Sequence, residues 1–228
     1  MAIPLQAERN RNIVFLYSGL AFLATLALSG VFAWVNIANY NWLSPLFERS
    51  SDHTIWGILQ RWFLIVLILG VSLWKPRLVG FQVGRIFQHW RMVLVILVLN
   101  IAVIGGYRLI AGSTPYTGID LLINEVLTVP LVEEIFWRGV IFAALLVILR
   151  KFLPEGSSGI LAGVFIGICF GLLHSVNALF GYPPAFVALQ TANATVWGVV
   201  YGIARAKTDS IYPPILFHAA MNLVVALG

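Results

Sequence analysis

Long apolar stretches separated by short polar segments constrain this chain more than any other feature. A transmembrane helix needs about 20 mostly apolar residues. Seven candidate spans follow one another at residues 12–36, 55–74, 91–111, 119–149, 160–179, 185–206 and 211–227. Hydrophobic residues make up 60% of the chain and charged residues only 10%, and a soluble domain of this composition would expose large apolar patches. We therefore predict an all-α polytopic membrane protein with about seven transmembrane helices.

The basic residues predict an orientation for these spans. Lys and Arg gather before the first candidate span and after the second, fourth and sixth. The positive-inside rule then places the N-terminus and these loops in the cytoplasm. This alternation accounts for the net charge of +5 better than nucleic-acid binding does. The lipid bilayer is therefore an expected partner, and nucleic acid is not.

The candidate spans fall into two groups. Residues 1–111 carry three spans of largely apolar sequence and are expected to form an N-terminal membrane scaffold. The basic loop from Lys75 to Trp90 is mildly amphipathic and is expected to lie along the cytoplasmic headgroups. Residues 112–228 hold the ionisable groups that lie near mid-span, and their first span is too long to stand upright in a bilayer. Pro130, in the middle of that fourth span, predicts a kink because it removes a backbone hydrogen bond.

Two carboxylates and a guanidinium lie near the middle of the fourth span. Burying a charge there costs roughly 2.5 to 3.5 kcal/mol on insertion scales. On a helix Glu134 and Arg138 share a face, whereas Glu133 points about 100° away. Glu134 and Arg138 are therefore expected to form a structural ion pair. Glu133 is left without that partner and is the candidate general base, with a bound water as its substrate.

The fifth and seventh spans add polar groups at similar depth. Phe170 and His174 share one helix face, with Asn177 nearly aligned, and His218 shares another with Asn222. A lone histidine in a membrane helix is more often a packing residue than a catalyst. Three helices that each bring polar groups into the membrane favour a shared cavity near the midplane. The polar row of the sixth span either lines this cavity or forms interhelical hydrogen bonds: Gln190, Asn193 and Thr195.

The sequence also bears on zinc-dependent, serine and aspartyl protease mechanisms. Glu133, His174 and His218 are a ligand set that zinc accepts, but no HExxH spacing is present and each ligand comes from a separate span. We therefore expect no metal and no other cofactor, with zinc as the alternative. Cys169 is the single cysteine and excludes an internal disulfide. Neither a GxSG nor a GxGD motif occurs, which disfavours serine and aspartyl intramembrane proteases.

Three short motifs follow one another in the last four spans. They are EExxxR at Glu133–Arg138, FxxxH at Phe170–His174 and HxxxN at His218–Asn222. In this order, on successive membrane spans, they resemble the CPBP family of CAAX proteases and bacteriocin-processing proteins, also described as type II CAAX prenyl endopeptidases. The resemblance covers about residues 119–227 and includes the stretch 201–215 that leads into the last motif.

The resemblance implies a role for each motif residue. Glu133 and His174 would activate a water for attack on a peptide carbonyl, and His218 and Asn222 would stabilise the oxyanion. The remaining motif residues would position the site: Glu134, Arg138 and Phe170. Residues 112–228 would then be a CAAX protease-like catalytic membrane domain in a multi-pass protein of a bacterial cell membrane.

The expected function is that of an intramembrane endopeptidase. Its substrate would be a lipidated or membrane-embedded protein or peptide, with or without a prenyl group. One alternative is a noncatalytic membrane adaptor or bacteriocin-immunity protein that uses the same pocket. Another is a proton-coupled transporter, but a transporter predicts symmetry between two halves, and the polar groups here are confined to the last four spans.

Overall fold

The computed structural model describes residues 62–111 and 118–227, together with isolated positions between 16 and 34. Apart from those positions, the span predicted at 12–36 lies outside the described residues, as do residues 55–61 of the second span. The scaffold predicted for residues 1–111 is thus described continuously only from residue 62. Every element within the two continuous ranges is a helix, in agreement with the predicted all-α fold.

The helices follow the predicted spans closely in the second half of the chain. The first described group contains α3 (Trp62–Trp74), α4 (Pro76–Val79), the 3₁₀ turn η1 (Phe87–His89) and α5 (Trp90–Ala111). The fourth predicted span contains α6 (Ile119–Ile123), η2 (Asn124–Thr128), α7 (Val129–Glu134), η3 (Ile135–Ile141) and α8 (Phe142–Leu149). The last group contains α9 (Glu155–Leu173), the 3₁₀ helix η4 (His174–Phe180), α10 (Pro184–Thr208) and α11 (Tyr212–Leu227).

Three helical stretches of the described residues are long and apolar enough to cross a membrane, namely Phe87–Ile110, Glu155–Phe180 and Pro184–Thr208. Helix α11 is apolar but shorter, with 16 residues. Large apolar side chains on the outside of the bundle, such as Leu73, Leu109 and Ile110, are 82–90% exposed. Such an apolar exterior suits lipid and not water. The total of seven spans stays a prediction.

The fourth predicted span is one uninterrupted helix with two irregular segments. Both η2 and η3 are π-helical, and they flank the short helix α7 that carries Pro130. Proline lacks the N–H that an α-helix would use, so the wider turn before it is a local accommodation. The kink predicted at Pro130 stays a prediction, and the structure shows π segments on both sides of the helix that carries it. Glu133 and Glu134 lie in α7, between these two π segments. Such segments occur frequently at functional sites.

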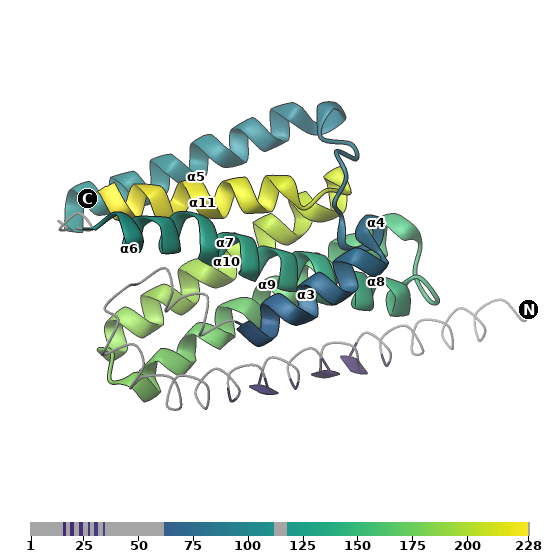
Figure 1. The fold of residues 1–228 in the computed structure, drawn as a ribbon, viewed down its shortest axis with the longest axis horizontal. Coiled ribbons are helices and arrows are strands. Elements are labelled where there is room, and N and C mark those ends of the chain that lie inside the picture. Colours follow the sequence, from purple (N-terminus) through teal and green to yellow (C-terminus); the bar gives the residue numbers. More distant parts are fainter. Residues whose placement is uncertain are drawn as a thin grey trace, which may run out of the picture.

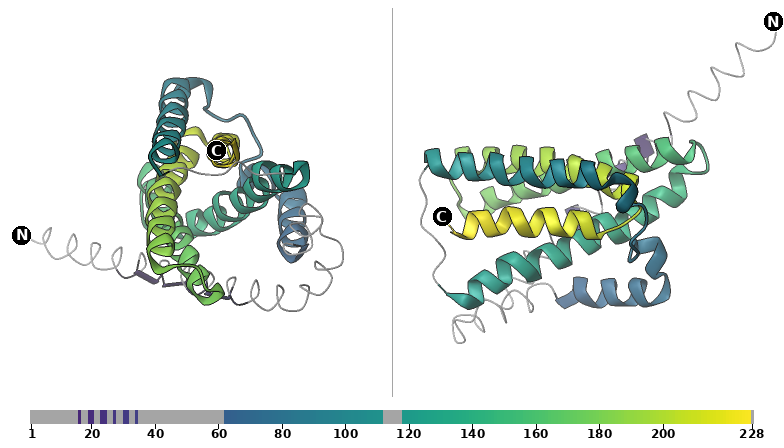
Figure 2. Two further views of the ribbon diagram at one scale, coloured as in Figure 1. Left: turned by 90° about the vertical axis from the view of Figure 1, so that its left-hand side faces the viewer. Right: turned by 90° about the horizontal axis from the view of Figure 1, so that it is seen from above.

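Two close helix pairs organise the bundle (Figures 1 and 2). Helices α5 and α11 lie side by side and run in the same direction, while α9 and α10 run antiparallel. Glycines allow the second pair to approach until backbone meets backbone. A Cβ atom at Gly167 of α9 would collide with the backbone of Gly198 and Val199 on α10. The end of α9, where His174 lies, is thereby held against α10.

The described basic segments, which follow the second, fourth and sixth predicted spans, lie at one end of the bundle, on the right in Figure 1. The backbone N–H of Arg85, between α4 and α5, donates to the carbonyl of Thr208 at 2.6 Å. The backbone N–H of Ile211 donates to the carbonyl of Gly80 at 3.0 Å. This grouping is what the positive-inside argument requires, and the side of the membrane on which this end lies stays a prediction.

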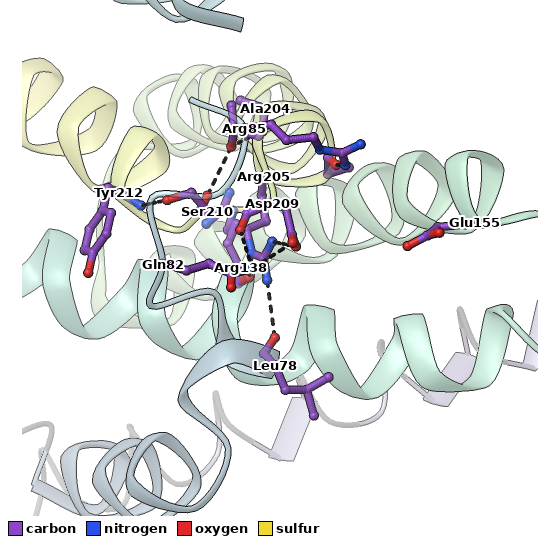
Figure 3. A network of polar contacts seen from close by, with 12 residues as sticks. Leu78, Gln82, Arg85, Arg138, Glu155, Ala204, Arg205, Asp209, Ser210 and Tyr212 are labelled. Atoms are coloured by element: carbon purple, nitrogen blue, oxygen red, sulfur yellow. Dashed lines mark hydrogen bonds and ion pairs between the residues drawn. The ribbon is translucent and has the colours of Figure 1, made fainter. Parts of the chain in front are cut away.

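Arg205 corrects one detail of the predicted topology. The sequence places it among the loop charges that face the cytoplasm, but its side chain is buried. Its Nε donates to the carbonyl of Arg138 at 3.1 Å and its Nη2 to the carbonyl of Leu78 at 3.3 Å, and Asp209 pairs with it at 3.1 Å (Figure 3). The reason is that α10 continues to Thr208, so Arg205 lies inside the helix and faces the bundle.

Candidate active site

Glu134 is the centre of a buried charge cluster. Its Oε1 accepts a hydrogen bond from Nη1 of Arg138 at 3.0 Å and lies 2.8 Å from Nδ1 of His218. The side chains of Glu134 and Arg138 have no exposed area. The ion pair predicted from their i, i+4 spacing is therefore confirmed. His218 arrives from α11, 84 residues further along the chain, so one carboxylate joins two helices.

Aromatic rings enclose the guanidinium of Arg138. It lies 4.3 Å from the ring centroid of Phe170 on α9 and 5.9 Å from that of Tyr201 on α10. Its Nη2 also donates to the carbonyl of Gly198 at 3.3 Å. Cation–π contacts gain strength in dry surroundings. The ring of Phe170 also packs edge-on against the His174 ring at 4.9 Å, so Phe170 contacts both Arg138 and His174.

Glu133 has different surroundings from its neighbour. Its side chain is half-buried and lines the central cavity. No hydrogen bond or ion pair joins it to another residue within 62–111 or 118–227. His174 lines the same cavity. The prediction that the two glutamates point to different partners is thus realised, with Glu134 bonded and Glu133 left to the cavity.

Hydrogen bonds determine which ring nitrogen of each histidine is left for other contacts. Nδ1 of His174 lies 2.9 Å from the carbonyl of Phe170. A carbonyl can only accept, so this contact requires a proton on Nδ1 and leaves Nε2 as an acceptor in the neutral ring. His218 has its Nδ1 on the Glu134 carboxylate, so its Nε2 is the nitrogen left over. That nitrogen can donate only if the ring is a cation.

Asn222 lies one helical turn beyond His218 on α11. Its Nδ2 donates to the backbone carbonyl of Glu125 at 2.7 Å, which ties α11 to the π segment η2. An amide group carries two N–H donors, so the second is not used by this bond. Asn222 thus lies at the cavity wall with its orientation fixed by a backbone contact.

All four predicted catalytic residues line a single cavity of about 840 Å³. They come from α7, the start of η4 and α11, in agreement with the expectation of one site shared by several helices. Two of the lining residues, Tyr182 and Phe186, are exposed aromatic residues at one end of the cavity wall. This end is opposite the basic end, because it is formed by the N-terminal part of α10 and the C-terminal parts of α5 and α11.

The sequence left two roles open for the polar residues of α10, namely lining the cavity and forming hydrogen bonds between helices. The structure gives different answers for different residues. Gln190 and Asn193 line the cavity, and both bond across helices. Asn177 donates to Oε1 of Gln190 at 2.7 Å, and Asn193 contacts the sulfur of Met221 at 3.9 Å. Thr195 is not at the cavity wall. Its hydroxyl donates to the carbonyl of Thr191 in its own helix at 2.7 Å, because its face of α10 packs against Gly171 of α9.

Two cavity residues escaped the sequence-based prediction of the site. Tyr201 is buried beside Arg138, and its hydroxyl accepts a hydrogen bond from Asn100 of α5 at 2.6 Å. Arg108, near the end of α5, also lines the cavity. Asn100 could have served as a signal, since a buried amide in a membrane helix needs a polar partner. Arg108 lies at a predicted span end, where a basic residue is ordinary.

Within the described ranges, no group of three or more His, Cys, Asp or Glu side chains is placed to hold a metal ion. His218 has its Nδ1 engaged by Glu134 and His174 has its Nδ1 engaged by a carbonyl. Cys169 is buried in the apolar core. The catalytic interpretation below uses side chains and water and keeps zinc as the alternative.

Comparison with known proteins decides the family. The sequence model of a family described as type II CAAX prenyl endopeptidase Rce1-like matches residues 115–224. This region belongs to that family. The match contains all three motifs and agrees with the resemblance seen in the sequence. No curated protein and no solved structure gives a significant match to the chain. Family membership and the long apolar helices together identify an integral membrane protein of a protease family.

Proposed function

We propose that the protein is an intramembrane endopeptidase of the glutamic type. It would hydrolyse a peptide bond of a lipidated or membrane-embedded protein, with or without a prenyl group. The observation that carries the proposal is the different state of two adjacent glutamates. Glu134 is bonded to Arg138 and His218, whereas Glu133 lines the cavity that His174 also lines.

Water is the nucleophile in this proposal. A water between Glu133 and His174 gives up a proton to the carboxylate or to Nε2 of the imidazole, and its oxygen attacks the peptide carbonyl carbon. General base catalysis requires a proton acceptor within hydrogen-bond reach of the water, and Glu133 and His174 are proposed to share this role. The proton then passes to the leaving nitrogen as the C–N bond breaks, so that water is consumed and two chain ends form.

Charge develops on the carbonyl oxygen during this attack. The free N–H of Asn222 and Nε2 of a protonated His218 are the donors proposed to stabilise it. Glu134 holds His218 in place, and Arg138 holds Glu134. Because the donors are fixed by the bonds to Glu134 and to the Glu125 carbonyl, little reorganisation would be needed as the charge appears.

The test compares protein termini in membranes from cells that express the wild type, Glu133→Gln or Glu155→Gln at equal abundance. Glu155 is an exposed glutamate that pairs with Arg150 and is the matched control. We expect new termini with the wild type and the control, and a loss of about 10²- to 10⁴-fold in their rate of appearance with Glu133→Gln. Identical termini in all three, with His174→Ala equally silent, would instead support a noncatalytic adaptor.

A further inference from the structure

Arg205 of α10 is a buried arginine that bonds directly to the backbone of a motif residue. Its Nε donates to the carbonyl of Arg138 at 3.1 Å, and its Nη2 donates to the carbonyl of Leu78 at 3.3 Å (Figure 3). Its Nη1 pairs with Asp209 at 3.1 Å. The side chain is only 2% exposed, and burying a charged group is costly. Two bonds to carbonyls therefore need an explanation beyond the ion pair.

The irregularity of η3 explains why the carbonyl of Arg138 is free to accept this bond. In a π-helix the N–H groups bond to carbonyls five residues back, as that of Phe142 does to the carbonyl of Trp137. The regular helix α8 begins at Phe142, and its N–H groups bond four residues back. A helix that changes from five-residue to four-residue bonding skips one carbonyl, and the carbonyl after that of Trp137 belongs to Arg138. A buried carbonyl needs a partner, and Arg205 provides it.

The same part of η3 is also held by close packing. A Cβ atom at Gly139 would lie 2.6 Å from Cγ1 of Val79 and 3.1 Å from Cδ1 of Ile211. Val79 and Ile211 have no exposed area, and the backbone N–H of Ile211 donates to the carbonyl of Gly80 at 3.0 Å. Residues 138 and 139 are thus enclosed by α4, α10 and the start of α11.

The side chain of Arg138 connects the contact with Arg205 to the candidate active site. Its Nη1 donates to Oε1 of Glu134 at 3.0 Å, and the same oxygen lies 2.8 Å from Nδ1 of His218. Arg205 therefore fixes the backbone of the residue whose side chain holds the Glu134 carboxylate. Because His218 is a proposed oxyanion donor, its position matters for the rate, and a misplacement of about 1 Å can cost about 10²-fold.

The ion pair with Asp209 does not by itself account for Arg205. The side chain of Asp209 is 48% exposed, and an ion pair that is open to solvent contributes little to stability. The loop after α4 is instead shaped around the guanidinium. A Cβ atom at Gly80 would lie 2.7 Å from Cζ of Arg205, so a side chain there would displace the group that bonds to Arg138.

Resting on the proposed protease function, we propose that Arg205 is a positioning residue of the active site. It binds the carbonyl that η3 leaves unpaired, and it thereby keeps Arg138, Glu134 and His218 in their bonded arrangement. It touches neither the substrate nor the attacking water. Loss of this side chain should therefore disturb the ring of His218 and slow cleavage while the helices stay folded.

Nuclear magnetic resonance of the histidine rings tests this arrangement without a substrate. The full chain with ¹⁵N-labelled histidine is purified in detergent, and the ring signals of His218 are assigned by their loss in His218→Gln. We expect Arg205→Met to shift or remove the Nδ1 signal of His218. The signal of His174 should persist, because its Nδ1 bonds to the nearby carbonyl of Phe170. A merely structural role at the basic end of the bundle would leave both signals unchanged.

Asp209→Asn is the matched control. Asp209 has a φ of 52°, a conformation that Asn also adopts, so this change removes the ion pair and leaves the two carbonyl bonds of Arg205. Cleavage, measured from the protein termini described above, should fall about 10²-fold in Arg205→Met and stay close to the wild type in Asp209→Asn. Arg205→Lys has a single nitrogen in place of the planar guanidinium and should lie between them.

Several outcomes would overturn the proposal. They are an unchanged His218 signal or unchanged cleavage in Arg205→Met, and Asp209→Asn as impaired as Arg205→Met, which would assign the effect to the ion pair. If Arg205→Met does not elute as a single peak in size-exclusion chromatography, Arg205→Lys decides, and wild-type behaviour of that variant in both measurements would also overturn it. A shifted His218 signal without new termini from the wild type would reject the protease function and leave the role of Arg205 standing.

Discussion

Replacing Glu134 by Gln should destabilise the protein far more than the same change at Glu133. Glu134 has no exposed area, and its Oε1 meets both Arg138 at 3.0 Å and His218 at 2.8 Å. Gln removes the negative charge and leaves the guanidinium of Arg138 buried without a counter-charge. Breaking one partner of a buried ion pair costs about 3 to 5 kcal/mol. Glu133 has no ion pair with a described residue to lose.

The expected difference is large enough to measure in detergent. For a chain of this size, 3 to 5 kcal/mol corresponds to a fall in Tm on the order of 10 °C. Thermal unfolding followed by tryptophan fluorescence should show this fall for Glu134→Gln, with Glu133→Gln close to the wild type. The double variant Glu134→Gln, Arg138→Met removes both charges together. It should recover most of the lost stability, because replacing a whole buried pair by neutral groups is often close to neutral.

The double variant makes the reasoning refutable. Equal Tm values for the two single Gln variants would show that the ion pair contributes little. A double variant as unstable as Glu134→Gln alone would show that the cost comes from lost packing and not from the stranded charge of Arg138. In either case, the assignment of a structural role to Glu134 and a chemical role to Glu133 would lose its energetic basis.

Two other predictions concern helix packing and chemistry. Gly167→Leu should prevent α9 and α10 from packing, because even its Cβ would collide with the backbone of Val199; Gly106→Leu, where nothing lies within 4 Å of such an atom, is the control. Membrane yield and Tm of both variants check this, and a normal Tm for Gly167→Leu would contradict the packing. Substrate cleavage, measured from the same termini as above, should survive EDTA and 1,10-phenanthroline. Inhibition that added zinc reverses would restore the metal alternative built on Glu133.

Local geometry explains what the sequence could predict about the site. The Glu134–Arg138 pair follows from helical periodicity alone, since residues four apart share a face. In the structure Nη1 of Arg138 lies 3.0 Å from Oε1 of Glu134. The same periodicity separated Glu133 from Glu134. These predictions needed no knowledge of where other helices lie.

The missed features all depend on packing between distant segments. The local sequence could not predict the bond between His218 and Glu134, because 84 residues separate them. Arg205 was read as a loop charge, although its partners on α4 and η3 are 127 and 67 residues away. Thr195 was grouped with Gln190 by polarity, yet the rotation of α10 against α9 turns it away from the cavity.

Gly198 shows how helix packing and site chemistry depend on each other. Its carbonyl accepts a hydrogen bond from Nη2 of Arg138 at 3.3 Å. A Cβ atom there would lie 2.9 Å from the Gly167 carbonyl and 3.2 Å from the Arg138 guanidinium. The lack of a side chain thus allows α9 and α10 to touch and leaves the carbonyl open to Arg138. Arg138 in turn bonds to Glu134, and Glu134 bonds to His218. The close approach of α9 and α10 therefore contributes to the position of His218 on α11.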